Sequence, residues 1–355
     1  MARALELAER GLFTTQPNPR VGCVIAHGEE VVGQGWHRRA GEPHAEVFAL
    51  REAGERARGA TAYVTLEPCA HHGRTPPCAD ALVAAGVARV VIATEDPFPQ
   101  VAGRGIATLR DAGIVVDSGL MCEAARELNI GFFSRIERGR PFVRVKLAMS
   151  LDGRTALAGG DSKWITGEAA RADVQRWRAR SSAILTGSGT VLADNPRLTV
   201  RLPDELHVPP LRVVLDRRLR TPAGSHVLDG AAPTLLLHVA DTACADDRFA
   251  QVERVAVAGQ GGALDLGAVL TLLAERGCNE LHVEAGPTLC GALFAAGLVD
   301  ELLLYIAPLL LGDSARPLLQ LPALADMAAR WQLQTVDRRA VGDDLRLRLQ
   351  PRAMP

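Results

Sequence analysis

The sequence predicts an α/β protein of two domains, on three observations. The chain has 355 residues, of which 48% are apolar, and one hydrophobic core rarely serves so long a chain. Short apolar segments alternate with helix-like segments in both halves, which is typical of sheets covered by helices. A charged segment, Arg135–Pro141, ends in Gly-Arg-Pro and separates the two halves. We therefore expect one domain over residues 1–139 and a second over residues 140–355.

The first half is expected to form a three-layer α/β/α sandwich. Its first two strands are joined by the turn His27-Gly28-Glu29-Glu30, and Gly59 and Gly86 end two of its helices. The expected strands are Val21–Ala26, Val31–His37, Thr61–Leu66, Val87–Ala93 and Ile114–Val116, and the expected helices are Ala45–Arg58, Ala79–Ala85, Ile106–Ala112 and Cys122–Asn129.

The second half continues the alternation, with no internal repeat of the first. The stretch Val239–Gly262 is rich in Ala and Asp and has weak periodicity, so we expect loops there. The expected strands are Phe142–Leu147, Ala183–Thr186, Leu211–Asp216, Thr234–His238, Glu280–Glu284 and Glu301–Ile306, and the expected helices are Glu168–Arg180, Asp265–Glu275 and Thr288–Ala296.

Charge and hydropathy argue against several classes of protein. Basic and acidic residues number 40 and 41, so the chain has no general attraction to nucleic acid. Charged residues such as Arg3 and Glu6 interrupt the amino-terminal segment, where a signal peptide would be apolar. The longest apolar run, Leu302–Leu311, is too short to cross a membrane, which takes about 20 residues. We therefore expect a cytoplasmic protein that binds neither nucleic acid nor membranes.

Two of the seven cysteines, together with a histidine, have the pattern of a zinc site. The residues are Pro43-His44-Ala45-Glu46, then Glu67-Pro68-Cys69, and then Cys78. Hydrolytic zinc sites use three protein ligands and keep a fourth position for water, with a carboxylate close by. His44, Cys69 and Cys78 are therefore the candidate ligands, and Glu46 is the candidate acid/base. In a reducing compartment the other cysteines are expected to be small buried residues, namely Cys23, Cys122, Cys244, Cys278 and Cys290.

The spacing predicts two of the ligands at the starts of helices. His44 and Glu46 can converge only if His44 lies in an irregular first turn, which Pro43 favours. Cys78 opens the expected helix, where free N–H groups favour a thiolate. An H-x-E motif followed by P-C-x-x-C is the signature of zinc-dependent nucleobase deaminases. This chain departs from the signature, because eight residues separate Cys69 from Cys78.

The eight-residue insertion, AHHGRTPP, leaves alternatives open. Either His71 or His72 could replace one of the three ligands, and together with Arg74 they would suit a phosphorylated substrate. Taken singly, H-A-E is most often an exposed helix start and two distant cysteines are most often unrelated. Their common placement around one buried strand favours a metal site. We therefore expect a zinc-dependent deaminase that acts on a pyrimidine-type ring.

Signals in the second half are weaker. The segment Glu284-Ala285-Gly286-Pro287-Thr288-Leu289 follows a strand and opens a helix, where free N–H groups can bind an anion, although ordinary turns look alike. A G-x-G-x-x-G motif is absent, which argues against a Rossmann domain. Ser162, Arg178 and Arg201 could clamp a phosphate, although a single arginine is more often a solvated surface residue.

Several longer segments make the chain recognisable. They are TAYVTLEPCAHHGRTPPC, with QPNPRVGCVI before it and AMSLDGRTA, SKWITG and VEAGPTL after it. With these segments in this order, the chain resembles the family of bifunctional riboflavin-biosynthesis deaminase/reductases over nearly its whole length. The eight-residue insertion is itself a mark of that family. The resemblance implies a cytidine-deaminase-like domain followed by a dihydrofolate-reductase-like domain.

The resemblance also implies the activities and the cofactors. The first domain, with Zn²⁺, would deaminate 2,5-diamino-6-ribosylamino-4(3H)-pyrimidinone 5′-phosphate. The second domain would use NADPH to reduce the ribosyl chain of the product, 5-amino-6-(5-phosphoribosylamino)uracil, to a ribityl chain. Two-domain enzymes of this kind commonly pair through sheet edges or helices, so we expect a homo-oligomer.

Residue by residue, the resemblance implies a role for each matching position. It makes His44, Cys69 and Cys78 the zinc ligands and Glu46 the proton shuttle. The implied contacts of the deaminase substrate are Asn18, His37 and Arg74. The implied NADPH contacts are Ala148, Trp164, Thr190, Asp194, Gly286, Pro287, Thr288, Leu289, Cys290, Gly291 and Ala292. The implied contacts of the reductase substrate are Lys146, Ser162, Arg178, Leu198, Arg201 and Glu284.

Two features of the second half have more than one interpretation. Arg217 and Arg218 follow an expected strand, so they could bind the 2′-phosphate of NADPH or could lie in a plain exposed loop. Trp164 lies in a polar loop and is either a structural core residue or, as the resemblance implies, a surface for stacking.

Three other functions fit parts of the pattern. A polynucleotide deaminase would have P-C-x-x-C and a basic groove, and neither is present in the sequence. The second half could be only a dimerisation or regulatory module, but the candidate phosphate clamp and the glycine turn argue against that. A structural zinc module normally has four protein ligands, whereas this chain offers three beside Glu46.

Overall fold

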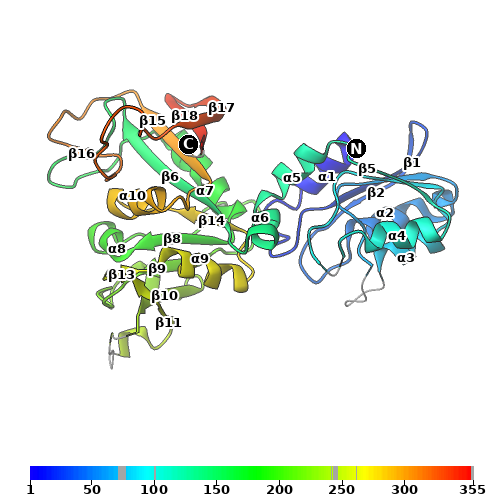
Figure 1. Cartoon of the computed structure of the whole chain (residues 1–355), viewed down its shortest axis with the longest axis horizontal. Coiled ribbons are helices and arrows are strands. Elements are labelled where there is room, and N and C mark those ends of the chain that lie inside the picture. The colour runs from blue at the N-terminus through cyan, green and yellow to red at the C-terminus, as the bar shows by residue number, and fades with distance from the viewer. Residues whose placement is uncertain (71–76, 100, 241, 243–246, 261, 353–355) are drawn as a thin grey trace. The chain divides into compact units, whose positions relative to one another are not determined.

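The computed structural model describes residues 1–70, 77–99, 101–240, 242, 247–260 and 262–352. The chain divides into two compact units (Figure 1). The first unit contains Met1–Gly139 and Leu206–Val208, and the second contains Arg140–Glu205 and Pro209–Pro355. The α/β class expected from the sequence is confirmed in both.

The first unit is built on a five-stranded sheet with the order β2-β1-β3-β4-β5. The neighbours of β1 run antiparallel to it, whereas β3, β4 and β5 run parallel to one another. The strands are β1 Gly22–His27, β2 Glu30–Trp36, β3 Thr61–Val64, β4 Arg89–Ile92 and β5 Val115–Ser118. The helices are α1 Ala2–Glu9, α2 Ala45–Ala53, α3 Cys78–Ala84, α4 Arg104–Asp111, α5 Cys122–Leu128 and α6 Ile130–Arg138, with a short 3₁₀ turn η1 Gly54–Ala57.

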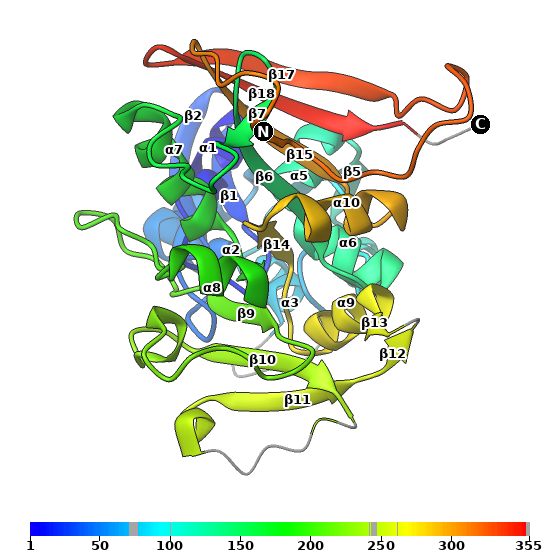
Figure 2. The ribbon, with the colours of Figure 1, turned by 90° about the vertical axis from the view of Figure 1, so that its left-hand side faces the viewer.

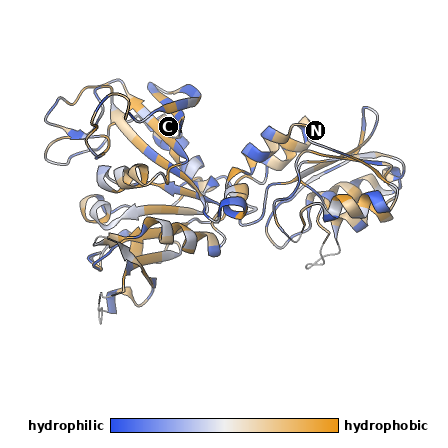
Figure 3. Cartoon of the chain, viewed as in Figure 1, coloured by the Kyte–Doolittle hydropathy of each residue, from blue (hydrophilic) through white to orange (hydrophobic). Residues whose placement is uncertain are grey.

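Helices cover both faces of this sheet, so the predicted three-layer sandwich is confirmed. Successive strand residues point to opposite faces, and Ile25 packs in one core with residues of α2, α3 and α4. Its neighbour Val24 packs instead with Ala4 and Leu7 of α1. Helices α3 and α4 show both polar and apolar residues (Figure 3), as expected for helices with one buried side.

The charged segment expected to separate the domains is partly helical. Helix α6 runs to Arg138, because Phe132 and Phe133 on its other side are buried against Leu66. Its charged residues Glu137 and Arg138 are exposed. The helix expected over Ala45–Arg58 is shorter in the structure. Helix α2 ends at Ala53, and the chain continues as the 3₁₀ turn η1.

The second unit contains a nine-stranded sheet with the order β11-β10-β9-β8-β14-β6-β15-β18-β17. The first seven strands in this order run parallel, and the carboxy-terminal pair β18 and β17 runs antiparallel (Figure 2). The strands are β6 Phe142–Ser150, β8 Ala183–Gly187, β9 Leu211–Leu215, β10 Thr234–Val239, β11 Glu253–Val257, β14 Glu280–Val283, β15 Glu301–Ala307, β17 Leu333–Val341 and β18 Asp344–Pro351.

Helices also cover both faces of the second sheet. Residues of α9 and α10 pack in one core with Val145, Leu185 and Val213, whereas α8 packs with Ile184 and Val214 on the other face. The helices are α7 Glu168–Arg180, α8 Ser188–Asp194, α9 Leu266–Glu275 and α10 Pro287–Ala295, with 3₁₀ turns η2 His226–Leu228 and η3 Asp247–Phe249. Two small strand pairs complete the unit, β7 Arg154–Ala156 with β16 Arg316–Pro317, and β12 Gly259–Gln260 with β13 Ala263–Leu264.

The expectation of loops over Val239–Gly262 is wrong for part of that stretch. Strand β11 lies within it and forms the edge of the large sheet against β10. Four of its five residues are exposed or half-buried, so it lacks the apolar run that identifies an inner strand. In the part of the chain that the structure describes, no helix has the length and hydropathy needed to cross a membrane.

Candidate zinc centre and cofactor cavity

Three ligand atoms of the predicted zinc site lie together in the first unit. The ligand atoms of His44, Cys69 and Cys78 are all within 4.8 Å of one another. Nδ1 of His44 faces both sulfurs, at 3.4 Å from Cys78 Sγ and 3.6 Å from Cys69 Sγ. An imidazole nitrogen and two sulfurs at this separation are a donor set that suits a zinc ion with a fourth position left open.

Local backbone structure explains this convergence. His44 is the N-cap of α2 and has an extended backbone, with φ −77° and ψ 168°, so its side chain is freed from the helical spacing. Cys78 is the first residue of α3 and follows Pro77. Cys69 lies in the loop after β3, and the backbone N–H of Cys78 donates a hydrogen bond to its sulfur at 3.3 Å.

The electrostatics of the two cysteines favour thiolate formation at this site. Hydrogen bonds from the thiol and the backbone N–H of Cys78, and from His44, lower the pKa of Cys69 to about 4 despite partial burial. The pKa of Cys78 is raised, because its thiol donates to Cys69 and is itself buried. A bound cation would favour the thiolate form of both sulfurs.

Glu46 lies beside this donor set, in the first turn of α2, and is only 3% exposed. Its Oε2 atom has no hydrogen-bond partner. Burial raises the pKa of Glu46 to about 7, although the neighbouring His44 opposes the shift. A buried carboxylate oxygen without a partner, next to three metal-binding atoms, fits a centre in which a metal and its water complete the contacts.

One predicted substrate contact, His37, lies next to the donor set, and a second, Asn18, contacts His37. The rings of His37 and His44 are edge to face, with centroids 5.3 Å apart. Nδ1 of His37 is 3.2 Å from the carbonyl of Pro43, and its Nε2 is 3.1 Å from Nδ2 of Asn18. Burial lowers the pKa of His37, so the neutral ring donates to Pro43 and accepts from Asn18.

The remaining predicted contact of this site, Arg74, lies outside the described residues, as do His71 and His72. Their proposed roles, including the alternative that one of the histidines is a ligand, stay predictions.

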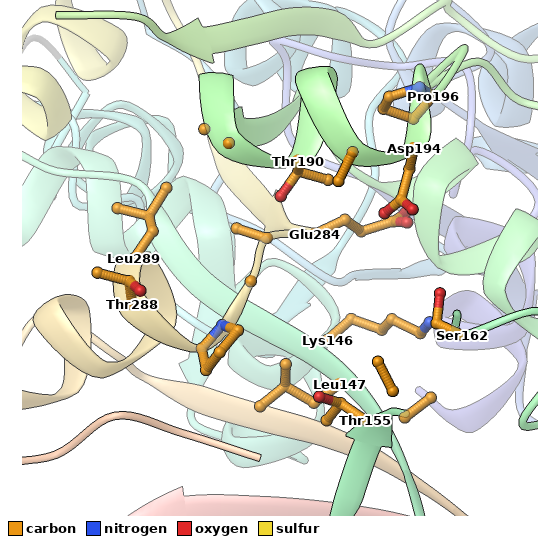
Figure 4. Close-up of a pocket in the computed structure, with 18 of the residues that line it drawn as sticks. Lys146, Leu147, Thr155, Ser162, Thr190, Asp194, Pro196, Glu284, Thr288 and Leu289 are labelled. Carbon is orange, nitrogen blue, oxygen red and sulfur yellow. The ribbon is translucent and has the colours of Figure 1, made fainter. Parts of the chain in front are cut away.

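The second unit contains a cavity of about 1200 Å³. It lies where the parallel strands β8, β9 and β14 end, the edge at which α/β sheets usually bind ligands. Figure 4 shows Lys146, from β6, extending toward Ser162 across this cavity. Among the described residues, two acidic ones, Asp194 and Glu284, line it together with eight basic ones: Lys146, Lys163, Arg171, Arg178, Arg197, Arg201, Arg217 and Arg316. This excess of positive charge suits a ligand with several phosphates.

Nearly all of the predicted reductase contacts line this one cavity. The two exceptions are in α10: Cys290 is buried in the core, with its thiol donating to the carbonyl of Ala285, and Gly291 packs against the backbone of Gln320. The contacts that line it are Lys146, Ala148, Ser162, Trp164, Arg178, Thr190, Asp194, Leu198, Arg201, Arg217, Glu284, Gly286, Pro287, Thr288, Leu289 and Ala292.

Arg178 and Glu284 form a two-point ion pair in the wall of the cavity. Nε of Arg178 is 2.5 Å from Oε1 of Glu284, and Nη2 is 2.8 Å from Oε2. Burial opposes ionisation of Glu284, but the charge and hydrogen bonds of Arg178 hold the pKa of Glu284 well below its usual range. In the predicted phosphate clamp, the charge of Arg178 is balanced by Glu284. More of the positive charge left for a phosphate therefore comes from Arg201. Among the described residues Arg201 has no carboxylate partner at ion-pair distance.

The surroundings of Trp164 and of the two adjacent arginines bear on the alternatives left open for them. Trp164 is 69% exposed, with the Arg171 guanidinium 4.7 Å from its ring, so it is not a core residue. Arg217 lines the cavity, whereas Arg218 does not and is exposed. Arg171 and Arg316 also line the cavity and were missed from the sequence, because neither belongs to a motif.

Two family models match this chain. The model described as "Cytidine and deoxycytidylate deaminase zinc-binding region" matches residues 1–94, and the model described as "RibD C-terminal domain" matches residues 141–347. The riboflavin biosynthesis protein RibD of Escherichia coli K12 is 52% identical, over 98% of each chain. The protein of that name from Bacillus amyloliquefaciens is 45% identical, over 99% of this chain and 95% of the relative.

Solved structures resemble the whole chain as well. RibD of Acinetobacter baumannii superposes with a TM-score of 0.92 at 46% identity, and the comparison covers 99% of this chain and 97% of that one. A Thermotoga maritima diaminohydroxyphosphoribosylaminopyrimidine deaminase/5-amino-6-(5-phosphoribosylamino)uracil reductase superposes with a TM-score of 0.89 at 33% identity, with the same coverage.

Proposed function

The chain belongs to the RibD family of riboflavin biosynthesis proteins, and we propose that its two units catalyse two successive reactions of that pathway. The first domain, residues 1–139, is the zinc-dependent deaminase of 2,5-diamino-6-ribosylamino-4(3H)-pyrimidinone 5′-phosphate. The second domain, residues 140–355, is the NADPH-dependent reductase of 5-amino-6-(5-phosphoribosylamino)uracil. The observation that carries the proposal is the convergence of His44, Cys69 and Cys78 beside the buried, partnerless oxygen of Glu46.

In the deaminase, the three ligands would hold zinc and Glu46 would move the protons. Bound zinc lowers the pKa of water and so supplies a nucleophile at neutral pH. Glu46 accepts the proton that the water loses as its oxygen adds to the ring carbon bearing the amino group. It passes that proton to the ring nitrogen, then takes the second proton from the added oxygen as the carbonyl forms and delivers it to the departing amino group, which leaves as ammonia. Asn18 and His37 would orient the ring, since His37 contacts both Asn18 and the ligand His44.

In the reductase, the residues bind and orient rather than react. Bound NADPH supplies the hydride. The start of α10 has Gly286 as its N-cap and Pro287 in its first turn, and this helix start offers N–H groups to the phosphates of the cofactor. Lys146, Ser162 and Arg201, which line the cavity, would hold the phosphorylated sugar, and the exposed ring of Trp164 would stack on a ligand. The basic lining as a whole offsets the phosphate charges of both ligands.

We also propose where the enzyme is located and how it assembles. The described cysteines include no disulfide, and the deaminase needs two of them as thiolates, so we place the enzyme in the reducing cytoplasm. The expected homo-oligomer stays a prediction, which light scattering on the purified chain checks.

A two-part assay tests the proposed function on the full chain. The diaminopyrimidinone phosphate is added first without NADPH, and ammonia release is followed; NADPH is then added, and its oxidation is followed by absorbance. We expect ammonia in the first stage and NADPH oxidation only after deamination has produced the reductase substrate. Oxidation of NADPH at full rate in the second stage, when the first stage has released no ammonia, would contradict the proposed order of the two reactions.

A further inference from the structure

Two buried glutamates flank the metal-binding atoms, and their surroundings differ. Glu46 keeps an oxygen without a partner, as its proposed chemistry requires. Glu67, two residues before the ligand Cys69, is 4% exposed, and both of its carboxylate oxygens are fully engaged. Because both oxygens of Glu67 already accept hydrogen bonds, the carboxylate is not placed to bind a metal or move protons. Its role must therefore lie in the backbone groups that it contacts.

Glu67 accepts hydrogen bonds from four backbone N–H groups in the segment that leads into α4. Its Oε2 accepts hydrogen bonds from Asp96 at 3.2 Å and Gly103 at 3.0 Å. Its Oε1 accepts from Gly105 at 2.9 Å and Ile106 at 3.2 Å. These donors include the free N–H groups at the helix start, where a negative side chain is favoured.

The α4 helix is a firm anchor, because Ile106 and Leu109 are buried in the main core of the first unit. It also touches the ligand loop directly. A Cβ atom placed on Gly105 would lie 2.0 Å from the carbonyl oxygen of Pro68, so the helix backbone rests against the residue between Glu67 and Cys69. The ligand loop also contacts α3, because the carbonyl of Cys69 accepts a hydrogen bond from the backbone N–H of Ala79, at 3.2 Å.

We propose that Glu67 is a positioning residue that ties the Cys69 loop to α4 and so sets where the Cys69 sulfur meets the metal. The inference rests on the proposed zinc-dependent deaminase and adds a residue to it. Partners behind the ligands of a metal site commonly change metal affinity or activity by about 10- to 100-fold when they are replaced. Replacement of Glu67 should therefore weaken and distort the metal site without touching any ligand.

The test uses Co²⁺ as a spectroscopic substitute for zinc in the full chain. The variants are Glu67→Gln, which keeps one acceptor oxygen, Glu67→Ala, which keeps none, and Gly105→Ala, which pushes α4 off the Pro68 carbonyl. Glu95→Gln is the matched control, since Glu95 is exposed on the neighbouring loop. We expect Co²⁺ affinity to fall by about 10-fold in Glu67→Gln and about 100-fold in Glu67→Ala. The cobalt d–d bands should shift at saturation, and NADPH oxidation should stay unchanged.

The outcomes distinguish this inference from the proposed function. Equal Co²⁺ affinity and superimposable spectra would overturn the role of Glu67, even if thermal stability fell, because a merely structural residue leaves the bound metal unaltered. If Glu67→Ala does not fold, Glu67→Gln and Gly105→Ala decide the question in the same way. A parent chain without a thiolate-to-cobalt absorption band would instead overturn the zinc site itself, and with it the role of Glu67.

Discussion

The zinc centre and the cofactor cavity differ in how each is assembled. The zinc centre uses three donor atoms within 4.8 Å, from two helix starts and one loop. The cavity is lined by residues that extend from Lys146 to Gln320 and come from strands, helices and loops. Donor atoms at a metal cannot be exchanged without losing the metal, whereas a large cavity shares binding among many contacts. Single substitutions should therefore abolish deamination but only weaken reduction.

The largest effect is expected from removing a zinc ligand. Cys78→Ala leaves two protein ligands, too few for a hydrolytic zinc site. We expect zinc to be lost and ammonia release to fall to background, while NADPH oxidation with the reductase substrate persists. Cys122→Ala is the control, because Cys122 belongs to the same unit but not to the donor set. Metal analysis and both assays on one preparation check this, and retained ammonia release in Cys78→Ala would refute the ligand assignment.

The next effect in size concerns Glu46. Glu46→Gln keeps the size of the side chain but cannot carry protons, so ammonia release should fall by about 10²- to 10⁴-fold. Zinc content should stay that of the parent, which separates this variant from loss of a ligand. The exposed Glu42 offers a control as Glu42→Gln. Ammonia release near the parental rate would remove Glu46 from the mechanism.

A smaller effect is expected in the cavity, from Arg178→Lys. A lysine cannot reproduce the two-point contact that Arg178 makes with Glu284. Hydrogen bonds between charged groups contribute about 1.5–3 kcal/mol, so kcat/KM for NADPH oxidation should fall by about 10- to 100-fold. Arg176→Lys on the same helix is the control, since Arg176 is exposed and pairs with Glu205. Ammonia release should not change in either variant, and a loss of both activities would contradict the independence of the two sites.

The smallest effect tests which arginine recognises the cofactor. Arg217→Ser should reduce the preference for NADPH over NADH by about 10-fold, as expected for one lost charged hydrogen bond. Arg218→Ser should leave the preference unchanged, because only Arg217 lines the cavity. Steady-state KM values for the two cofactors measure the preference. Equal behaviour of the two variants would reject a specific role for Arg217.

The same contrast explains how much could be predicted from the sequence. The zinc centre could be predicted from residue types and their spacing, because H-x-E followed by two cysteines around one buried strand resembles the signature of zinc-dependent deaminases. The cavity gave only weak signals of its own, a candidate phosphate clamp and a helix start, and most of its contacts were predicted through the family resemblance. Its contacts are individually ordinary, and Arg316 reaches it from the small β7–β16 pair, with no local signal to indicate that.

Missed elements show which physical signals were absent or overlooked. Helices α1 and α6 were not expected, because charged residues interrupt their apolar ones, although Leu7 and Phe133 are buried. Strand β18 did have a signal, since Leu345, Leu347 and Leu349 alternate with Arg346 and Arg348. Edge strand β11 had only a weak signal in the sequence, because an edge strand need not be apolar on either face.

The most direct test of the account is zinc content measured together with ammonia release from the diaminopyrimidinone phosphate, before and after chelation. The account predicts one zinc ion per chain, ammonia release that stops when the metal is removed and returns when zinc is restored, and NADPH oxidation of the supplied reductase substrate that is indifferent to chelation. Ammonia release that continues in the metal-free protein, or a zinc-loaded protein that releases none, would contradict it.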